Sequence, residues 1–126
     1  MRIELKDPPR RFAVGNATPF EMKDCGTLRL DADEQVTFAT AAGAEYDVAR
    51  KSWGFYATPS LNGRLAQFGL RGVLIKNRDT GRYFVLLVER DHEQGFDDYC
   101  VQENLAVITW LDTTEALDDL SRKLGE

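Results

Sequence analysis

The chain has 126 residues, of which 43% are hydrophobic and 29% charged, and its formal net charge is −5. This length predicts a single domain, and the composition is that of a globular protein rather than a disordered chain. The longest apolar run, 84–88, is far shorter than the ~20 residues of a transmembrane helix. Acidic residues and two prolines near the N-terminus argue against a secretory signal, so we expect a cytoplasmic protein.

Charge is distributed unevenly along the sequence. Residues 50–82 contain seven Lys and Arg residues and one acid, whereas residues 89–126 contain eleven acids and three Lys and Arg residues. A basic segment of this kind attracts anionic ligands. The alternative is that the basic and acidic segments neutralise each other in the fold.

The first third of the chain is predicted to change from an irregular arm to strands. Pro8, Pro9 and Pro19 break any helix, so residues 1–24 are expected to be an irregular arm with at most one short strand, at 11–14. Apolar residues then alternate with polar ones in 27–30 and 36–40, which predicts a hairpin closed by the acidic turn 31–34. A further strand at 45–50 extends it to a three-stranded meander.

Two more strands, at 53–58 and 69–77, are predicted on either side of a connection. Pro59 and the pair Asn62-Gly63 are typical of turns, so residues 60–69 are interpreted as a loop. A short capped helix is the alternative for the same residues, because their apolar side chains also recur at helical spacing.

Residues 77–82 predict a hairpin turn whose Asp and Gly suit a type I turn followed by a left-handed residue. The strand that follows, 83–89, is apolar on both of its faces. A strand with two apolar faces is usually covered on both sides, so we expect it to be central and paired with 72–77.

The last third predicts a helix at 91–102, a strand at 105–111 and a closing helix that begins after Asp112 or Thr113. The stripe formed by Leu117, Leu120 and Leu124 is expected to pack in the core. The predicted fold is therefore α+β, an antiparallel-rich sheet or partly closed barrel of about six to seven strands with two C-terminal helices packed on it. One domain comprises the arm (1–24), a strand-rich core (25–90) and a helix-strand-helix unit (91–126).

Metal and nucleotide sites lack their usual residues. The chain has one histidine, His92, and its two cysteines, Cys25 and Cys100, do not have zinc-site spacing. The acids of 31–34 are interpreted as a solvated turn rather than a cation site. No glycine-rich phosphate motif and no nucleophile elbow is present. We predict no bound metal and no cofactor.

A candidate site is predicted where cations, aromatic rings and polar side chains are concentrated around one turn. Arginine can hold carboxylate or phosphate with two hydrogen bonds, while aromatic faces stack on sugars or bases. The alternative is that Trp53 and Phe55 are core residues and that 59–63 is only a connection. The proposed ligand-binding residues are Arg50, Lys51, Trp53, Tyr56, Thr58, Ser60, Asn62 and Arg64.

These residues predict a non-catalytic accessory or binding protein whose basic aromatic cleft takes a small anionic or sugar-like ligand or an acidic segment of a partner, with Arg64 as the main anion-holding residue. The alternative function is a metal-independent enzyme with Glu45 or Asp47 as general base and Tyr56 as acid. In that enzyme Arg50 and Arg64 would hold the charge of the substrate. Binding of nucleic acid ranks third because the net charge is negative.

Overall fold

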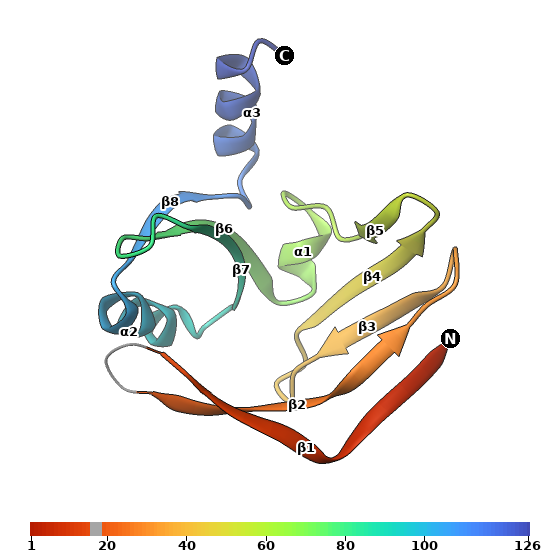
Figure 1. Ribbon diagram of the computed structural model, residues 1–126. Coiled ribbons are helices and arrows are strands. Elements are labelled where there is room, and N and C mark those ends of the chain that lie inside the picture. The colour runs from red at the N-terminus through yellow and green to blue at the C-terminus, as the bar shows by residue number, and fades with distance from the viewer. Residues whose placement is uncertain (16–18) are drawn as a thin grey trace.

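The computed structural model describes residues 1–15 and 19–126. In this part of the chain, eight strands form three antiparallel sheets and three helices accompany them, so the expected α+β class is confirmed. No sheet of the described residues closes into a barrel. In chain order the elements are β1 (Arg2–Val14), β2 (Phe20–Arg29), β3 (Gln35–Ala39), β4 (Glu45–Lys51), β5 (Gly54–Ala57), α1 (Arg64–Gln67), β6 (Leu70–Asn77), β7 (Tyr83–Glu89), α2 (Glu93–Glu103), β8 (Leu105–Trp110) and α3 (Thr114–Lys123) (Figure 1).

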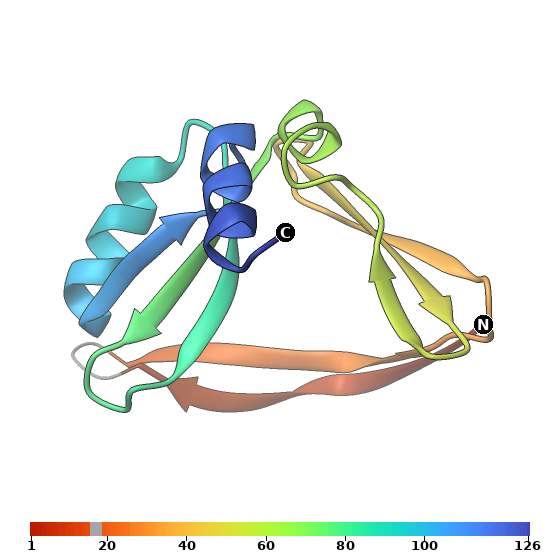
Figure 2. The same cartoon turned by 90° about the horizontal axis from the view of Figure 1, so that it is seen from above.

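The three sheets lie along the sides of an open triangle (Figure 2). Strands β1 and β2 form one side, β3, β4 and β5 the second, and β7, β6 and β8 the third. Helix α1 lies at the corner where the second sheet passes into the third, and α2 covers the third sheet. Helix α3 extends away from the rest of the molecule (Figure 1).

The arm is a long hairpin, so the prediction that 1–24 is irregular is wrong. β1 and β2 pair from Arg2↔Arg29 to Val14↔Phe20, with a shift of register between Leu5 and Arg10. The two prolines that led to the wrong prediction, 8 and 9, lie inside this interruption. A proline is tolerated at such a place because no ladder hydrogen bond is required of it.

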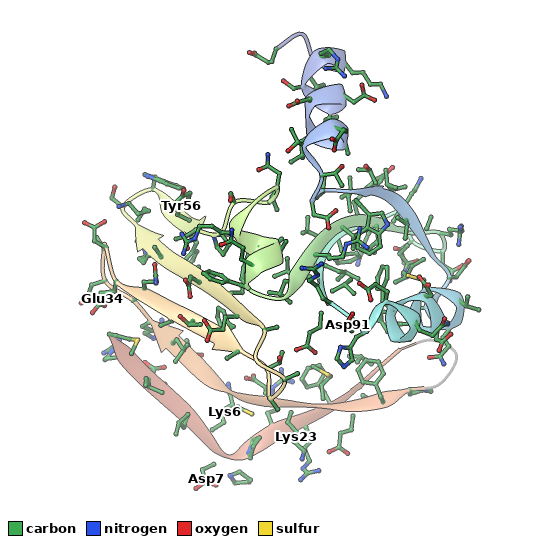
Figure 3. The ribbon with its side chains drawn as sticks, turned by 180° about the vertical axis from the view of Figure 1, so that it is seen from behind. Lys6, Asp7, Lys23, Glu34, Tyr56 and Asp91 are labelled. Atoms are coloured by element: carbon green, nitrogen blue, oxygen red, sulfur yellow. The ribbon has the colours of Figure 1, made fainter. Side chains whose placement is uncertain are left out.

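Ion pairs hold the arm where its register changes. The carboxylate of Asp24 lies 3.2 Å from the ammonium group of Lys6 and 3.5 Å from the guanidinium of Arg10, and Figure 3 shows where Lys6 lies on the arm. Hydrogen bonds from Lys6 and from the backbone N–H of Gly26 hold the pKa of Asp24 below its ordinary value. The carboxylate therefore stays ionised at neutral pH.

The second sheet is a meander of β3, β4 and β5 in that order. The predicted hairpin between 27–30 and 36–40 is not formed, because β2 pairs with β1 and not with β3. The predicted turn between them is present, since the N–H of Asp31 donates to Glu34 Oε1 over 2.7 Å. The alternation of both segments is real, but it reflects two strands that belong to different sheets.

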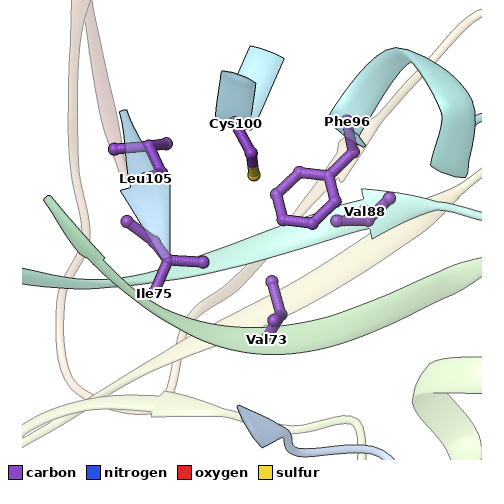
Figure 4. Packing of buried hydrophobic residues seen from close by; sticks show 6 residues of the cluster. All are labelled: Val73, Ile75, Val88, Phe96, Cys100 and Leu105. Atoms are coloured by element: carbon purple, nitrogen blue, oxygen red, sulfur yellow. The ribbon is translucent and has the colours of Figure 1, made fainter. Parts of the chain in front are cut away.

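The third sheet contains the larger core cluster (Figure 4). β6 is its central strand, and Val73 and Ile75 on β6 are fully buried. Helix α2 covers them with Phe96 and Cys100, and the ring of Phe96 meets that of Trp110 edge to face at 5.7 Å. The complete buried cluster is Val73, Ile75, Val88, Phe96, Cys100 and Leu105.

Strand β7 lies at an edge, which corrects the prediction that 83–89 is central, although its expected pairing with β6 is confirmed. Its face with Leu86 and Val88 packs against the cluster under α2. Its other face is covered only near Leu87, and Tyr83 and Val85 on that face are exposed. Phe84, which shares the face of Leu86 and Val88, is exposed as well. The apolar character of residues 83–85 therefore does not reflect burial within this chain.

The connection 60–69, interpreted above as a loop, contains the short helix α1, so the alternative is confirmed for 64–67. Leu65 of this helix is fully buried with Ala44 and Leu70 in a second, smaller cluster. The predicted N-terminal cap of α3 is confirmed, because the hydroxyl of Thr113 accepts from the N–H of Ala116 over 3.1 Å. The expectation that its leucine stripe is core is wrong, since α3 contains no buried residue.

Candidate functional site

Strand pairing separates the predicted site residues onto two faces of one sheet. Arg50 pairs with Phe55, whereas Tyr56 pairs with Ala49, and successive residues of a strand point to opposite faces. Arg50 and Tyr56 are therefore on opposite sides of the β3–β4–β5 sheet. The eight residues do not form the single basic aromatic cleft that was expected.

On the Tyr56 face, polar side chains lie together. Asp47 accepts a hydrogen bond from the hydroxyl of Thr37 over 2.5 Å, and Lys51 is bound to Asp33, also over 2.5 Å. Trp53 is exposed at the turn between β4 and β5, and Figure 3 shows Tyr56 at the margin of this sheet. The carboxylates considered as general bases share this face with Tyr56, but Arg50 does not.

The turn before α1 uses its polar residues to hold the chain. The N–H of Thr58 donates to the carbonyl of Asp47, and the hydroxyl of Ser60 accepts from the N–H of Arg64 over 2.8 Å. Asn62 reaches the first residue of α3 by donating to Thr114 Oγ1 over 3.2 Å. A Cβ atom at Gly63 would lie 2.7 Å from Ser60 Oγ. Much of the polar pattern in this segment therefore has a structural explanation.

Arg64 is exposed, as expected of an anion-holding residue. Its guanidinium carbon lies 5.0 Å from the centre of the Phe68 ring. An arginine over an aromatic ring keeps its hydrogen-bond donors available at its edge. Its predicted role in holding an anion stays a prediction.

The other face of the same sheet carries an apolar surface that sequence reasoning did not identify as a site. It borders a cavity of about 450 Å³ between β2 and the β3–β4–β5 sheet. We call this surface, formed by Val36, Phe38, Val48 and Phe55, the β3–β5 face; Gly26, Leu28 and Leu30 provide the rest of the cavity lining. The ring of Phe55 is 64% exposed, and the guanidinium carbon of Arg50 lies 5.9 Å from its centre.

A second cavity, of about 320 Å³, continues this surface toward the third sheet. Phe38 lines both cavities, and Tyr46, Leu70 and Leu87 line the second one. Burial raises the pKa of the Tyr46 phenol above its ordinary value. The two cavities form an apolar concave surface with a cation, Arg50, beside it. The alternation of 36–40 predicted which side chains share this face but not that they would remain uncovered.

A third cavity, of about 550 Å³, lies between the tip of the arm and the third sheet. Phe20 of β2 borders it on one side, while Phe84 of β7 and Tyr99 of α2 border it on the other. The arm thus meets both other sheets across open apolar spaces rather than through close packing.

Comparison with family models, curated proteins and solved structures finds no match for this chain. Among the described residues, no group of three or more His, Cys, Asp or Glu side chains is placed to hold a metal ion. Within the same residues, no helix has the length and apolar character required to cross a membrane. The geometry of the surface is therefore the basis for a functional proposal.

Proposed function

We propose that this chain is a non-catalytic binding protein, and that the β3–β5 face holds a protein segment with apolar side chains flanked by acidic ones. The single observation that carries the proposal is the cavity of about 450 Å³ lined by Leu28, Val36, Phe38, Val48 and Phe55. An exposed apolar surface of this kind is typical of a protein interaction site. Arg50 beside Phe55 supplies the attraction for acidic side chains.

A protein segment suits this surface better than a small polar ligand does. The lining side chains are apolar, so few polar groups converge there to orient a sugar or a small anion. Exposed aromatic rings with a neighbouring arginine are instead typical of the residues that contribute most to protein interfaces. Of the partners expected from the sequence, an acidic protein segment agrees best with the β3–β5 face.

The test uses anilinonaphthalene sulfonate, a fluorescent probe that is both apolar and anionic, with the protein at submicromolar concentration. We expect the folded chain to bind the probe, and Phe55→Ala to weaken that binding about tenfold, the effect of losing about 1.4 kcal/mol of contact. Arg50→Gln should weaken it less, because it removes only the charge at the margin.

Tyr83→Ala is the matched control, since Tyr83 is a similarly exposed ring on a different sheet. Its probe affinity should equal that of the unaltered chain. Equal affinities for the Phe55→Ala chain and the unaltered chain would overturn the proposed site, provided that circular dichroism shows both to be folded.

A further inference from the structure

Strand β7 has a free edge that lacks the usual protection of edge strands. It stands first in the order β7–β6–β8, so among the described strands only β6 pairs with it. Residues 83–88 contain no proline and no charged side chain, and the pairing of β7 with β6 has no bulge. Prolines, charges and bulges normally protect an edge, because an unprotected edge pairs readily with another strand. Tyr83 is 57% exposed and Val85 is 60% exposed.

Two hydrogen bonds determine which backbone groups of β7 point outward. The N–H of Arg90 donates to the carbonyl of Gly69, and the N–H of Asn77 donates to the carbonyl of Arg82. Residues that bond to the partner strand alternate with residues that do not along an antiparallel pair. The even-numbered residues of β7 therefore bond to β6. The residues that direct their N–H and C=O groups to the free edge are Tyr83, Val85, Leu87 and Glu89.

Apolar cavities lie on both faces of β7. Phe84 and Leu86 border the cavity of about 550 Å³ beside the arm tip, while Leu87 borders the cavity of about 320 Å³ beside the second sheet. A strand added to β7 would direct alternate side chains to these two faces. A cavity of about 150 Å³ holds a benzene ring, so both cavities have room for apolar side chains. The edge and its two cavities are therefore suited to an extended apolar segment.

The accessible charge at the start of β7 is positive. Arg82 is exposed and borders the larger cavity, while Lys76 Nζ lies 5.4 Å from the centre of the Tyr83 ring on the other face. Glu103 also borders the larger cavity, but it is buried. Opposite charges across an interface select the partner and its orientation. An acidic residue at one end of the segment would therefore be attracted to this end of β7.

The position of the arm favours a single segment over a second copy of the chain. Val14 and Phe20 of the arm border the larger cavity together with Phe84 of β7. A strand added to β7 would lie about 5 Å from it, in the space next to the arm. A second copy would have to bring its whole third sheet and α2 to the same space. The arm tip therefore obstructs a second copy more than it obstructs one extended segment.

We propose that β7 is a docking edge for an extended segment of another protein, which adds a strand to the third sheet. The segment has apolar side chains on both of its faces and an acidic residue at the end near Arg82. The added strand makes β7 central, which accounts for the apolar character of both faces of β7. This site lies on a different sheet from the β3–β5 face, so it goes beyond the proposed function.

The first test uses a fluorescein-labelled peptide, Asp-Glu-Val-Leu-Val-Phe-Val-Asp-Glu, whose acidic ends allow either orientation. Fluorescence anisotropy measures its dissociation constant. The measurements are made in the Phe55→Ala chain, so that binding at the β3–β5 face contributes little. Adding Val85→Pro should raise the dissociation constant at least about tenfold, since proline removes an outward N–H and places its ring on the edge.

Val85→Pro should leave the pairing of β7 with β6 intact, because Phe84 and Leu86 make those bonds. Circular dichroism checks the fold. Val85→Thr is the matched control, since threonine keeps the N–H, and its peptide affinity should be nearly unchanged. Arg82→Gln should raise the dissociation constant only about threefold, because it removes one exposed charge. Equal peptide affinities with and without Val85→Pro would overturn the inference.

The second test examines strand pairing without altering β7. One form of the peptide is N-methylated at its valines, and another at its leucine and phenylalanine. Alternate residues of a strand direct their N–H groups to opposite edges, and the larger side chains suit the larger cavity, so one edge of the peptide faces β7. We expect one methylated form to bind at least about tenfold more weakly than the other. Equal affinities would overturn the added strand, even if Val85→Pro fails to fold.

The remaining outcomes distinguish this inference from the alternatives. No binding at about 1 mM peptide, the weak end of specific affinity, would overturn it. A dimer of the unaltered chain that Val85→Pro makes monomeric would also overturn it, because a second copy would then occupy the edge. The proposed function is decided separately, since Val85→Pro should leave the binding of anilinonaphthalene sulfonate to the β3–β5 face unchanged.

Discussion

Arg71 connects the third sheet to the start of α3. Its Nε lies 2.7 Å from Asp112 Oδ2, its Nη2 lies 3.4 Å from Oδ1, and its guanidinium carbon lies 3.9 Å from the centre of the Trp110 ring. The hydrogen bond to Asp112 raises the pKa of the Arg71 guanidinium above its ordinary value. This ion pair joins the basic segment 50–82 to the acidic segment 89–126. It is one contact of the kind expected if the two segments neutralise each other's charge.

We expect Arg71→Ala to lower the free energy of unfolding by about 1.5–3 kcal/mol, the range for hydrogen bonds to charged groups, because Asp112 is mostly shielded from solvent. Arg71→Lys should recover only part of this, since lysine lacks the planar fork that binds two oxygens. Urea denaturation measures both changes. Arg122→Ala is the control, because its pair with Asp119 is exposed and should contribute about 0–1 kcal/mol. Similar effects of Arg71→Ala and Arg122→Ala would contradict this assignment.

At the scale of elements, the arm depends on one glycine next to its change of register. Gly26 has a φ of +145°, and a Cβ atom there would lie 2.2 Å from the carbonyl oxygen of Glu4. The Cα atom of Leu5 would be only 3.0 Å away, and these obstacles are backbone atoms, so a side chain at this position cannot be accommodated by rotating a neighbour. Glycine at position 26 therefore lets β1 and β2 pair without strain.

We expect Gly26→Ala to destabilise the pairing of β1 with β2 by more than about 1 kcal/mol, since alanine is strained in this conformation. Amide hydrogen exchange of residues in both strands should show the effect, while the β6 amides should change little. Gly95→Ala is the matched control, because its Cβ atom would meet nothing within 4 Å inside α2, and it should stabilise the chain by about 0.5–1 kcal/mol. Unchanged protection of the arm in Gly26→Ala would refute this role.

The sequence predicted correctly those turns and caps that depend on residues close to each other in the chain. The hairpin turn at 77–82 forms as expected, with Asn77 Oδ1 accepting from the N–H groups of Asp79 and Thr80 and with Gly81 at a φ of +73°. The cap of α3 formed for the same reason, because Thr113 and its partner are three residues apart. The arm was missed because its pairing joins residues up to 27 positions apart across two prolines.

At the scale of the whole molecule, the chain exposes 8909 Å², whereas a compact monomer of 14.2 kDa exposes about 6,800 Å². A second copy that covers the excess would make stability depend on protein concentration. Partners that bind the folded state stabilise it by mass action. We therefore expect the melting temperature of the chain to rise as its concentration is increased a hundredfold. Differential scanning calorimetry measures this change, and a concentration-independent melting temperature would show that no second copy covers the exposed surface.

The sequence by itself determined the α+β class, most strands after residue 35, both long helices and which side chains share a face of each strand. These features depend on periodicity, turns and caps, whose causes lie within a few residues. Only the tertiary structure decided which strands pair, that β7 is at an edge, and that the predicted site residues divide between two faces. Burial of Phe55 or Leu120 depends on whether another surface covers it, and that surface is distant in the chain or lies outside it.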